Sequence, residues 1–196
     1  MLGGPERGMR IAAVIVMGLA MMLAPQANAT DIWQQLRTEP GLVVLMRHAI
    51  APGGGDPAGF TLGDCRTQRN LSAEGRSQAR AIGRQFRTER VPIAQVRSSR
   101  WCRAADTARL LGLGTPRPTP ALDSVFTASP QVAAQRQRQA ERLIRTHRGK
   151  PGVLVLVGHQ ANIIDLTGIA PASGEAVVVR ADRNGSIEVV GRIQPP

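Results

Sequence analysis

Two short aliphatic segments, each ending in a histidine, constrain the fold of this chain more than any other feature. Their sequences are GLVVLMRH at residues 41–48 and GVLVLVGH at residues 152–159. Unbroken aliphatic runs of this length are typical of strands that are buried on both faces of an α/β sheet. Such sheets bind ligands at the carboxyl ends of their strands, so we expect His48 and His159 to meet in one crevice.

The chain is long enough for one domain: it has 196 residues, of which 42% are hydrophobic. Its start has the pattern of a secretory signal peptide, with basic residues, the apolar stretch 11–24 and then small residues up to Ala29. We therefore predict a signal peptide at 1–29 and a mature domain at 30–196. A retained membrane anchor is the alternative, but about 14 apolar residues are fewer than the roughly 20 that a membrane span needs.

Strand and helix patterns alternate along the rest of the chain. After the first strand, the expected elements are a Gly/Pro-rich loop at 51–65, a helix at 72–87, a strand at 91–96, helices at 101–111, 129–147 and 161–166, and a hairpin within 176–190. This order predicts a three-layer α/β/α sandwich with a mostly parallel central sheet.

The helix at 129–147 carries two specific expectations. Val132 is expected to face the core together with Ile144. His147 lies beside the end of the helix, where a surface cation would complement the helix dipole. We therefore give His147 no catalytic role.

Cys65 and Cys102 are the two cysteines of the chain. In an exported protein, an even pair of cysteines is typically bridged, so we predict a disulfide between them. Two free buried thiols are the alternative. Neither cysteine has a nearby histidine or the spacing of a metal ligand, which disfavours nucleophile and zinc roles.

The formal net charge of +11 favours anionic partners such as phosphate esters, nucleic acid and lipopolysaccharide. Only 3% of the residues are aromatic, and there is no tyrosine. Because single-stranded nucleic acid is bound largely by stacking of bases on aromatic side chains, this composition argues against a nucleic-acid partner.

Two arginines are expected beside the two histidines. Arg47 directly precedes His48, and the strand predicted at 91–96 leads towards Arg103. A neutral imidazole can attack phosphorus while guanidiniums bind the phosphoryl oxygens bidentately. Nearby cations also keep the pKa of His48 from rising above its ordinary value of about 6.5, so a nucleophilic neutral ring is available near pH 7. This set of side chains suits phosphoryl transfer.

Four ordered blocks of the sequence resemble those of the histidine phosphatase superfamily, whose phosphoglycerate mutases and acid phosphatases carry Arg-His-Gly after the first strand. The blocks are LMRHA at 45–49, NLSxxGxxQA at 70–79, SSxxxRAxxTA at 98–108 and VGHxxNI at 157–163. The resemblance implies a phosphoglycerate mutase-like fold and catalysis without a metal or cofactor. By motif position it makes His48 the phosphorylated nucleophile and makes Arg47, Arg103 and His159 the phosphate pocket.

The chain departs from the family pattern at two places. Ala49 stands where the first block usually has glycine. The acid that usually follows the third block is replaced by Ser124, and Asp123 lies one residue earlier. Asp123 is the first candidate for the proton donor, although a turn residue is the alternative interpretation. The other carboxylates left open for this role are Asp64 and Glu175, and Arg100 is expected at the rim of the phosphate pocket.

These observations predict an exported, periplasmic or secreted phosphomonoesterase with a phosphohistidine intermediate on His48. The arrangement is similar to that of lipopolysaccharide core heptose phosphatases, so the expected partner is a phosphorylated small molecule or an envelope sugar phosphate, with phytate as another option. No membrane span is expected after signal cleavage. A non-catalytic phosphate or lipopolysaccharide binding module on the same fold is the alternative. A cytoplasmic protein-phosphohistidine phosphatase conflicts with the signal peptide.

Overall fold

The computed structural model describes residues 1, 4 and 29–196, so the signal peptide predicted at 1–29 lies almost entirely outside the described residues. The helices are α1 (Ala29–Thr38), α2 (Ala73–Thr88), α3 (Cys102–Leu111), α4 (Pro130–His147) and α5 (Gln160–Thr167), with two 3-10 turns, η1 (Cys65–Thr67) and η2 (Pro120–Leu122). The strands are β1 (Val43–Arg47), β2 (Ile93–Ser98), β3 (Arg117–Pro118), β4 (Val153–Gly158), β5 (Ala176–Ala181) and β6 (Ile187–Ile193).

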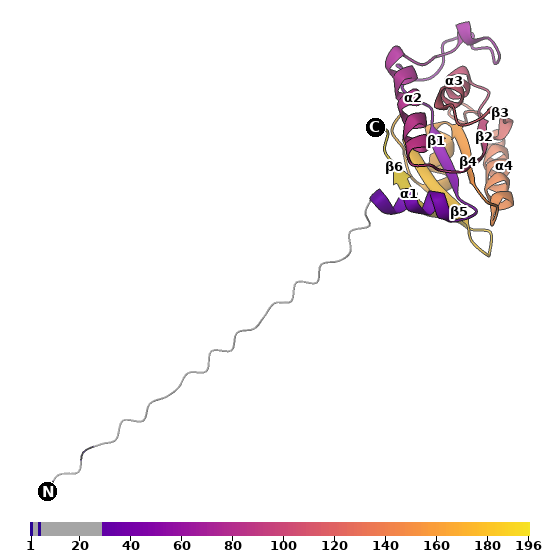
Figure 1. The fold of residues 1–196 in the computed structure, drawn as a ribbon. Coiled ribbons are helices and arrows are strands. Elements are labelled where there is room, and N and C mark those ends of the chain that lie inside the picture. Colours follow the sequence, from indigo (N-terminus) through magenta and orange to yellow (C-terminus); the bar gives the residue numbers. More distant parts are fainter. Residues whose placement is uncertain (2–3, 5–28) are drawn as a thin grey trace.

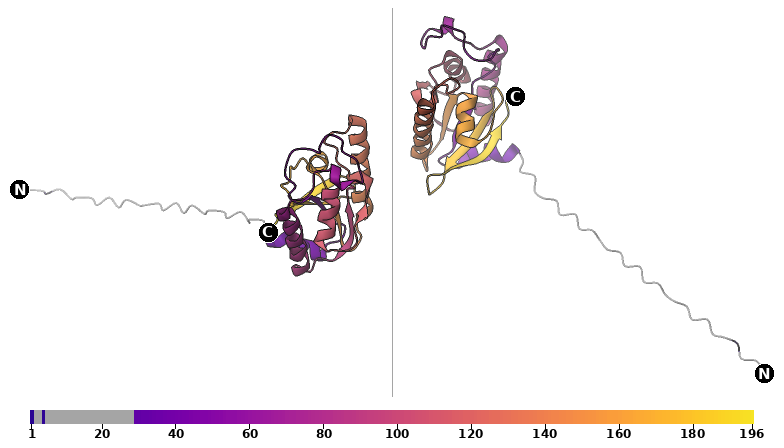
Figure 2. Two further views of the ribbon diagram at one scale, coloured as in Figure 1. Left: turned by 90° about the horizontal axis from the view of Figure 1, so that it is seen from above. Right: turned by 180° about the vertical axis from the view of Figure 1, so that it is seen from behind.

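The six strands form one sheet in the order β3-β2-β4-β1-β5-β6. The four strands from β3 to β1 are parallel, whereas β5 is antiparallel to β1 and pairs with β6 as the predicted hairpin. Figures 1 and 2 show helices on both faces of this sheet. The predicted α/β/α sandwich with a mostly parallel sheet is therefore confirmed.

Strand β4 shows why its aliphatic run is unbroken. Val153, Val155 and Val157 lie in one hydrophobic core with residues of α1, α2 and α3. Leu154 and Leu156 lie in a second core, on the other face, with residues of α4 and α5. Because successive side chains of a strand point to opposite faces, a strand between two helical layers must be apolar at every position.

Helix α2 begins where the sequence predicts, because the Ser72 side chain accepts a hydrogen bond from the backbone N–H of Gly75 at 3.0 Å. Its two glycines let it approach neighbouring backbone closely. A Cβ atom at Gly83 would lie 1.9 Å from the carbonyl oxygen of Leu111 at the end of α3. At Gly75 it would lie 2.0 Å from the carbonyl oxygen of Ile50, in the loop that follows the first histidine.

The predicted disulfide between Cys65 and Cys102 is confirmed. It joins η1, in the long loop after β1, to the first residue of α3. In Figure 1 this loop, coloured purple, extends over α3. The cross-link therefore ties an irregular segment to the helix that carries Arg103.

Within the described part of the chain, none of the helices combines the length and apolarity of a membrane span.

Two expectations for α4 were wrong. Val132, in the first turn of the helix, is 36% exposed and does not belong to the core. His147 is buried, and its Nε2–H donates a hydrogen bond to the carbonyl of Gly152 at 2.8 Å. Burial, opposed by that hydrogen bond, lowers the pKa of His147, with a smaller contribution from the charge of Lys150. His147 is thus a neutral link between α4 and the start of β4, not a surface cation.

One helix and one strand were not predicted. Helix α1 buries Ile32 and Leu36, one helical turn apart, in the core that α2 and α3 share. Strand β3 pairs only through Arg117 and Pro118, at the edge of the sheet. Proline lacks a backbone N–H, which confines it to such edges and hides the strand from a search for β-forming residues.

Candidate active site

The two histidines meet as predicted, at the carboxyl ends of β1 and β4. Arg47 and Gly158 are paired in register, and the residues that follow them are His48 and His159. The backbone N–H of His48 donates to the carbonyl of Gly158 at 3.0 Å. The two ring centroids are 5.5 Å apart, and both side chains are buried.

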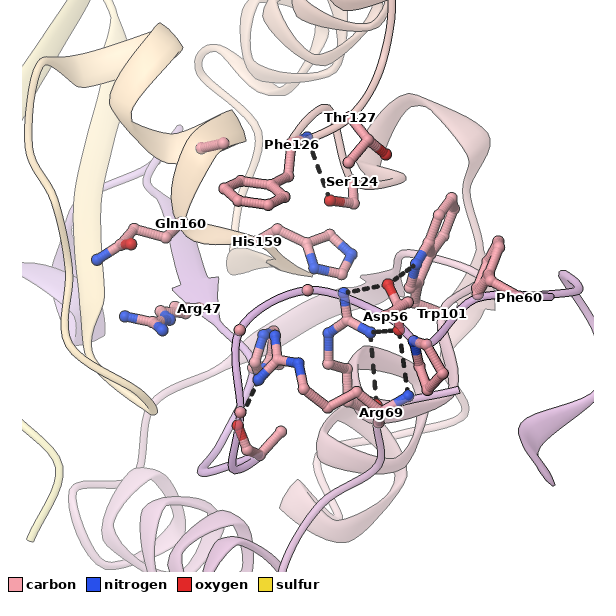
Figure 3. Close-up of a pocket in the computed structure, with 18 of the residues that line it drawn as sticks. Arg47, Asp56, Phe60, Arg69, Trp101, Ser124, Phe126, Thr127, His159 and Gln160 are labelled. Carbon is pink, nitrogen blue, oxygen red and sulfur yellow. Dashed lines mark hydrogen bonds and ion pairs between the residues drawn. The ribbon is translucent and has the colours of Figure 1, made fainter. Parts of the chain in front are cut away.

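A pocket of about 650 Å³ opens beside these rings. Figure 3 shows polar side chains directed into it from several elements. Of the predicted site residues, Arg47, His48, Arg103 and His159 all line the pocket. Its other lining residues are Ala51, Gly53, Gly54, Gly55, Asp56, Pro57, Phe60, Arg69, Trp101, Ser124, Phe126, Thr127, Gln160, Ala161 and Ile164.

The hydrogen bonding of His48 determines which of its nitrogens can react. Its Nδ1 lies 2.8 Å from the backbone carbonyl of Ala49. Because a carbonyl oxygen only accepts, Nδ1 carries the hydrogen, and Nε2 of the neutral ring keeps its lone pair. Burial lowers the pKa of His48 to about 3, and the charges of Arg103, Arg69 and Arg47 act in the same direction. His48 is therefore a neutral potential nucleophile throughout the neutral pH range.

Ala49, the departure from the first family block, is fully buried. Its backbone N–H donates to the Thr107 hydroxyl at 3.0 Å. That hydroxyl in turn donates to the carbonyl of Arg103 at 2.7 Å. The segment after β1 is thus anchored on α3, and the alanine methyl packs in a small apolar cluster with Leu71 and Ala79.

His159 is held from two sides. Its Nε2 lies 2.9 Å from the hydroxyl of Ser99, and the ring meets Trp101 edge to face, with centroids 5.7 Å apart. Complete burial lowers the pKa of His159 well below its ordinary value, and His48 and the nearby arginines lower it further. The second imidazole is therefore also neutral, with its Nδ1 edge not engaged by Ser99.

Three guanidiniums surround the pocket: those of Arg47, Arg69 and Arg103. Each has a buried Nε without a hydrogen-bond partner among the described residues. Burial lowers the pKa of both Arg47 and Arg69. Arg103 is buried, whereas Arg47 and Arg69 are half-buried. A group of guanidiniums with unused donors is suited to a multiply charged oxyanion. No cluster of three or more metal-ligand side chains occurs in residues 29–196.

Asp123 and Arg100 do not join this pocket. The Asp123 carboxylate is fully buried and accepts hydrogen bonds from the backbone N–H of Arg100 at 2.9 Å and from its Nε at 2.8 Å. It also lies 3.4 Å from the hydroxyl of Ser99, which contacts His159. The predicted acid and the predicted rim arginine therefore bind each other, and this placement does not support proton donation by Asp123.

The two other open candidates for the acid are also engaged elsewhere. Asp64 lies on the surface and forms an ion pair with Arg66. Glu175 is buried, and accepts hydrogen bonds from Arg192 Nε at 2.6 Å and from Gln194 Nε2 at 2.9 Å. Neither lines the pocket. Ser124, at the family's acid position, does line it.

Sequence reasoning missed two charged residues of the pocket. Arg69 directly precedes the second family block, and its charge beside that block was the available signal. Asp56 belongs to the Gly/Pro-rich loop, where no periodic pattern indicates which side chain turns inward. Phe60, which also lines the pocket, stacks on Trp101 with the ring centroids 5.1 Å apart.

The comparisons with known proteins agree with this geometry. Residues 43–125 match the family model of the histidine phosphatase superfamily, branch 1. No curated protein matches the chain significantly. This match covers less than half of the chain, and the structural neighbours described next share the fold.

Several solved structures have the same fold. The protein histidine phosphatase SixA, complexed with tungstate, is 18% identical, with 79% of this chain and 97% of that chain covered and a TM-score of 0.57. Phosphoserine phosphatase from Entamoeba histolytica in complex with 3-phosphoglyceric acid is 12% identical, with 78% and 96% covered and a TM-score of 0.55. Mycobacterial glucosyl-3-phosphoglycerate phosphatase is 16% identical, with 76% and 97% covered and a TM-score of 0.54.

Proposed function

We propose that this chain, which has the histidine phosphatase fold, is an exported phosphomonoesterase that forms a phosphohistidine on His48. One observation carries the proposal. The free Nε2 of a neutral His48 belongs to a pocket that is also lined by Arg47, Arg69 and Arg103. A nucleophile and a set of oxyanion ligands are the two requirements of covalent phosphoryl transfer.

The proposed reaction has two steps. The guanidiniums bind the phosphate oxygens, and His48 Nε2 attacks phosphorus while the bond from phosphorus to the ester oxygen breaks. The leaving oxygen takes the electron pair and a proton and departs as an alcohol. Water then attacks the phosphohistidine and the P–N bond breaks. Inorganic phosphate is released, and neutral His48 is regenerated.

His159 would support the first step without bearing a charge of its own. With Nε2 accepting the hydrogen of the Ser99 hydroxyl, Nδ1–H of the neutral ring can donate to a phosphate oxygen. Groups that are already in place stabilise the charge that develops on the phosphoryl oxygens, because they need no reorganisation during the reaction. In this proposal Asp123 acts as a positioning residue, because its carboxylate holds the backbone N–H of Arg100, the residue after Ser99.

The rim of the pocket favours a leaving group with a ring. The chain has only three Phe and two Trp residues, and Phe60, Trp101 and Phe126 line this pocket. Phe126 is 72% exposed, and Ile164 beside the pocket is 39% exposed. Flat apolar surfaces of this kind stack on the apolar face of a ring. They suit a singly phosphorylated sugar better than phytate, whose many phosphates need further cations.

An envelope sugar phosphate is therefore the substrate that we propose. By its name, one structural neighbour acts on a sugar-bearing phosphate ester, glucosyl-3-phosphoglycerate. The disulfide between Cys65 and Cys102 and the signal-peptide pattern at the start of the sequence support export, with the periplasm as the proposed location.

Trapping of the intermediate tests the proposal. The mature protein is mixed with a radiolabelled phosphomonoester, quenched, and examined for phosphate in an acid-labile, base-stable linkage. We expect label on the wild type and on a His147→Gln control, and none on His48→Ala. A chelator should not reduce turnover of a panel of envelope sugar phosphates.

The binding-module alternative predicts a different pattern. In that case phosphate or lipopolysaccharide binds without turnover, and His48→Ala leaves the affinity largely unchanged. Absence of both label and turnover in the wild type would exclude the enzymatic function.

A further inference from the structure

Departure of an alkoxide requires a proton, and the acids considered from the sequence lie outside the pocket. Among residues 29–196, Asp56 is the one carboxylate that lines it. It belongs to the loop between β1 and α2, and Figure 3 shows it between Trp101 and Arg69, beside the space that His159 faces. Its side chain is 16% exposed.

Asp56 is held by groups that belong to the pocket. Its Oδ1 accepts from Arg103 Nη1 at 2.6 Å and from the backbone N–H of Arg69 at 3.2 Å. Its Oδ2 accepts from Arg103 Nη2 at 3.1 Å and from Trp101 Nε1 at 3.0 Å. The carboxylate thus occupies both terminal nitrogens of a guanidinium that the proposed function assigns to the substrate phosphate.

We propose that Asp56 is the proton donor to the leaving alcohol, and that the substrate phosphate activates it by taking its place on Arg103. This inference rests on the proposed function. It assigns the acid to the loop after β1, not to the position at Ser124 where the family pattern has one.

Exchange of partners on Arg103 supplies the physical switch. The guanidinium fork binds either the Asp56 carboxylate or two phosphoryl oxygens bidentately. The loop that carries Asp56 is rich in glycine: Gly53, Gly55 and Gly59 have left-handed backbone conformations, and a Cβ atom at each would meet little. Glycine has the widest choice of backbone conformations, so such a loop can accommodate the exchange. A phosphate dianion that binds Arg103 would therefore leave Asp56 beside a new negative charge.

The proton affinity of Asp56 changes in the required direction. In the free protein, burial raises the pKa of Asp56, but hydrogen bonding and charge from Arg103 outweigh burial and lower that pKa. Once phosphate neutralises Arg103, the lowering influence of Arg103 on the pKa of Asp56 is lost, and the adjacent dianion raises that pKa. Asp56 can then take up a proton before the ester bond breaks.

The proton balance closes over one turnover. As His48 Nε2 forms its bond to phosphorus, the ester oxygen takes the electron pair of the breaking bond and the proton of Asp56. In the second step the Asp56 carboxylate accepts a proton from the attacking water. The P–N bond breaks and phosphate forms, with Asp56 protonated again. When phosphate leaves Arg103, Asp56 releases to solvent the proton it took up on substrate binding, and its carboxylate returns to Arg103.

Two esters with rings of similar size separate this role from a structural one. The leaving group of 4-nitrophenyl phosphate needs no proton, whereas benzyl phosphate releases an alkoxide that needs one. For Asp56→Asn we expect kcat/KM to fall by about 10²- to 10⁴-fold with benzyl phosphate, and by less than about tenfold with 4-nitrophenyl phosphate. Asp56→Glu should restore part of the benzyl phosphate activity.

The matched control is Asp64→Asn, at a half-exposed aspartate of the same loop whose partner is Arg66. It should leave both esters unaffected. Equal losses of kcat/KM on both esters in Asp56→Asn, or no loss on either, would overturn the inference. Phosphohistidine trapping with 4-nitrophenyl phosphate keeps the two proposals apart. If the wild type and Asp56→Asn are both labelled, the proposed function stands whatever the fate of Asp56.

Discussion

The rings of His48 and His159 face each other at a centroid distance of 5.5 Å, with an angle of 67° between their planes. They follow residues that are paired in register on adjacent parallel strands, β1 and β4. Both rings are neutral, because burial and the surrounding cations lower the pKa of each. The proposed site therefore combines two uncharged imidazoles with three arginines and one aspartate.

The lowered pKa of His48 predicts a dependence of stability on pH. The unfolded chain binds a proton at this residue below about pH 6.5, whereas the folded protein does so only near pH 3. Since the unfolded state then holds more protons, acidification between these values lowers the free energy of unfolding by up to about 1.4 kcal/mol per pH unit. Urea denaturation at pH 7 and pH 4.5 should show a smaller loss for His48→Asn than for the wild type. Equal losses would contradict the pKa assignment.

Replacement of Arg103 by lysine tests the bidentate contact. Lysine keeps the charge but cannot offer two parallel N–H groups. Loss of one charge-assisted hydrogen bond, worth about 1.5 to 3 kcal/mol, should lower kcat/KM roughly 10- to 100-fold in Arg103→Lys. Arg109→Lys, a change at an exposed position of the same helix, is the control and should leave kcat/KM unchanged. A similar loss in both variants would show that helix damage, and not phosphate binding, was measured.

Removal of the disulfide should destabilise the protein. The bond closes a loop with a sequence separation of 37, for which the chain-entropy relation gives about 3 to 4 kcal/mol. Thermal denaturation of Cys65→Ser/Cys102→Ser should show a lower Tm than the wild type. KM should also rise, because Cys102 directly precedes Arg103. Reductant should lower the Tm of the wild type and leave that of the double variant unchanged; an insensitive wild type would refute a stabilising bridge.

Gly83→Ala has two opposing effects on stability, the helix preference of alanine and the steric clash of its Cβ. Alanine favours a helix interior by about 1 kcal/mol over glycine. At this position, however, the new Cβ would lie 1.9 Å from a backbone oxygen of Leu111, which cannot rotate away. We expect a net destabilisation of about 1 to 3 kcal/mol in urea denaturation. The control, Ser77→Ala on the exposed face of α2, should be neutral or stabilising. Equal stabilisation of both variants would contradict the close helix contact.

The main strands and the central part of the site could be predicted from the sequence. Aliphatic runs indicate strands between two helical layers, and parallel pairing brings the ends of such strands to one edge of the sheet. His48 and His159 were therefore expected together, and the ordered blocks indicated Arg47 and Arg103. These predictions depended on local hydrophobic patterns, which can be read directly from a sequence. They also depended on the general rule that the ends of parallel strands meet at one edge of a sheet.

The tertiary structure alone decided which other charges enter the pocket. Asp56 and Arg69 lie in an irregular loop whose course is set by Arg103, Trp101 and the disulfide to α3. Asp123, the first candidate from the sequence, is instead buried against Arg100. No periodicity governs a loop, so its side chains take their directions from distant partners. The position of a carboxylate along the chain therefore could not show whether it faces substrate or a neighbouring arginine.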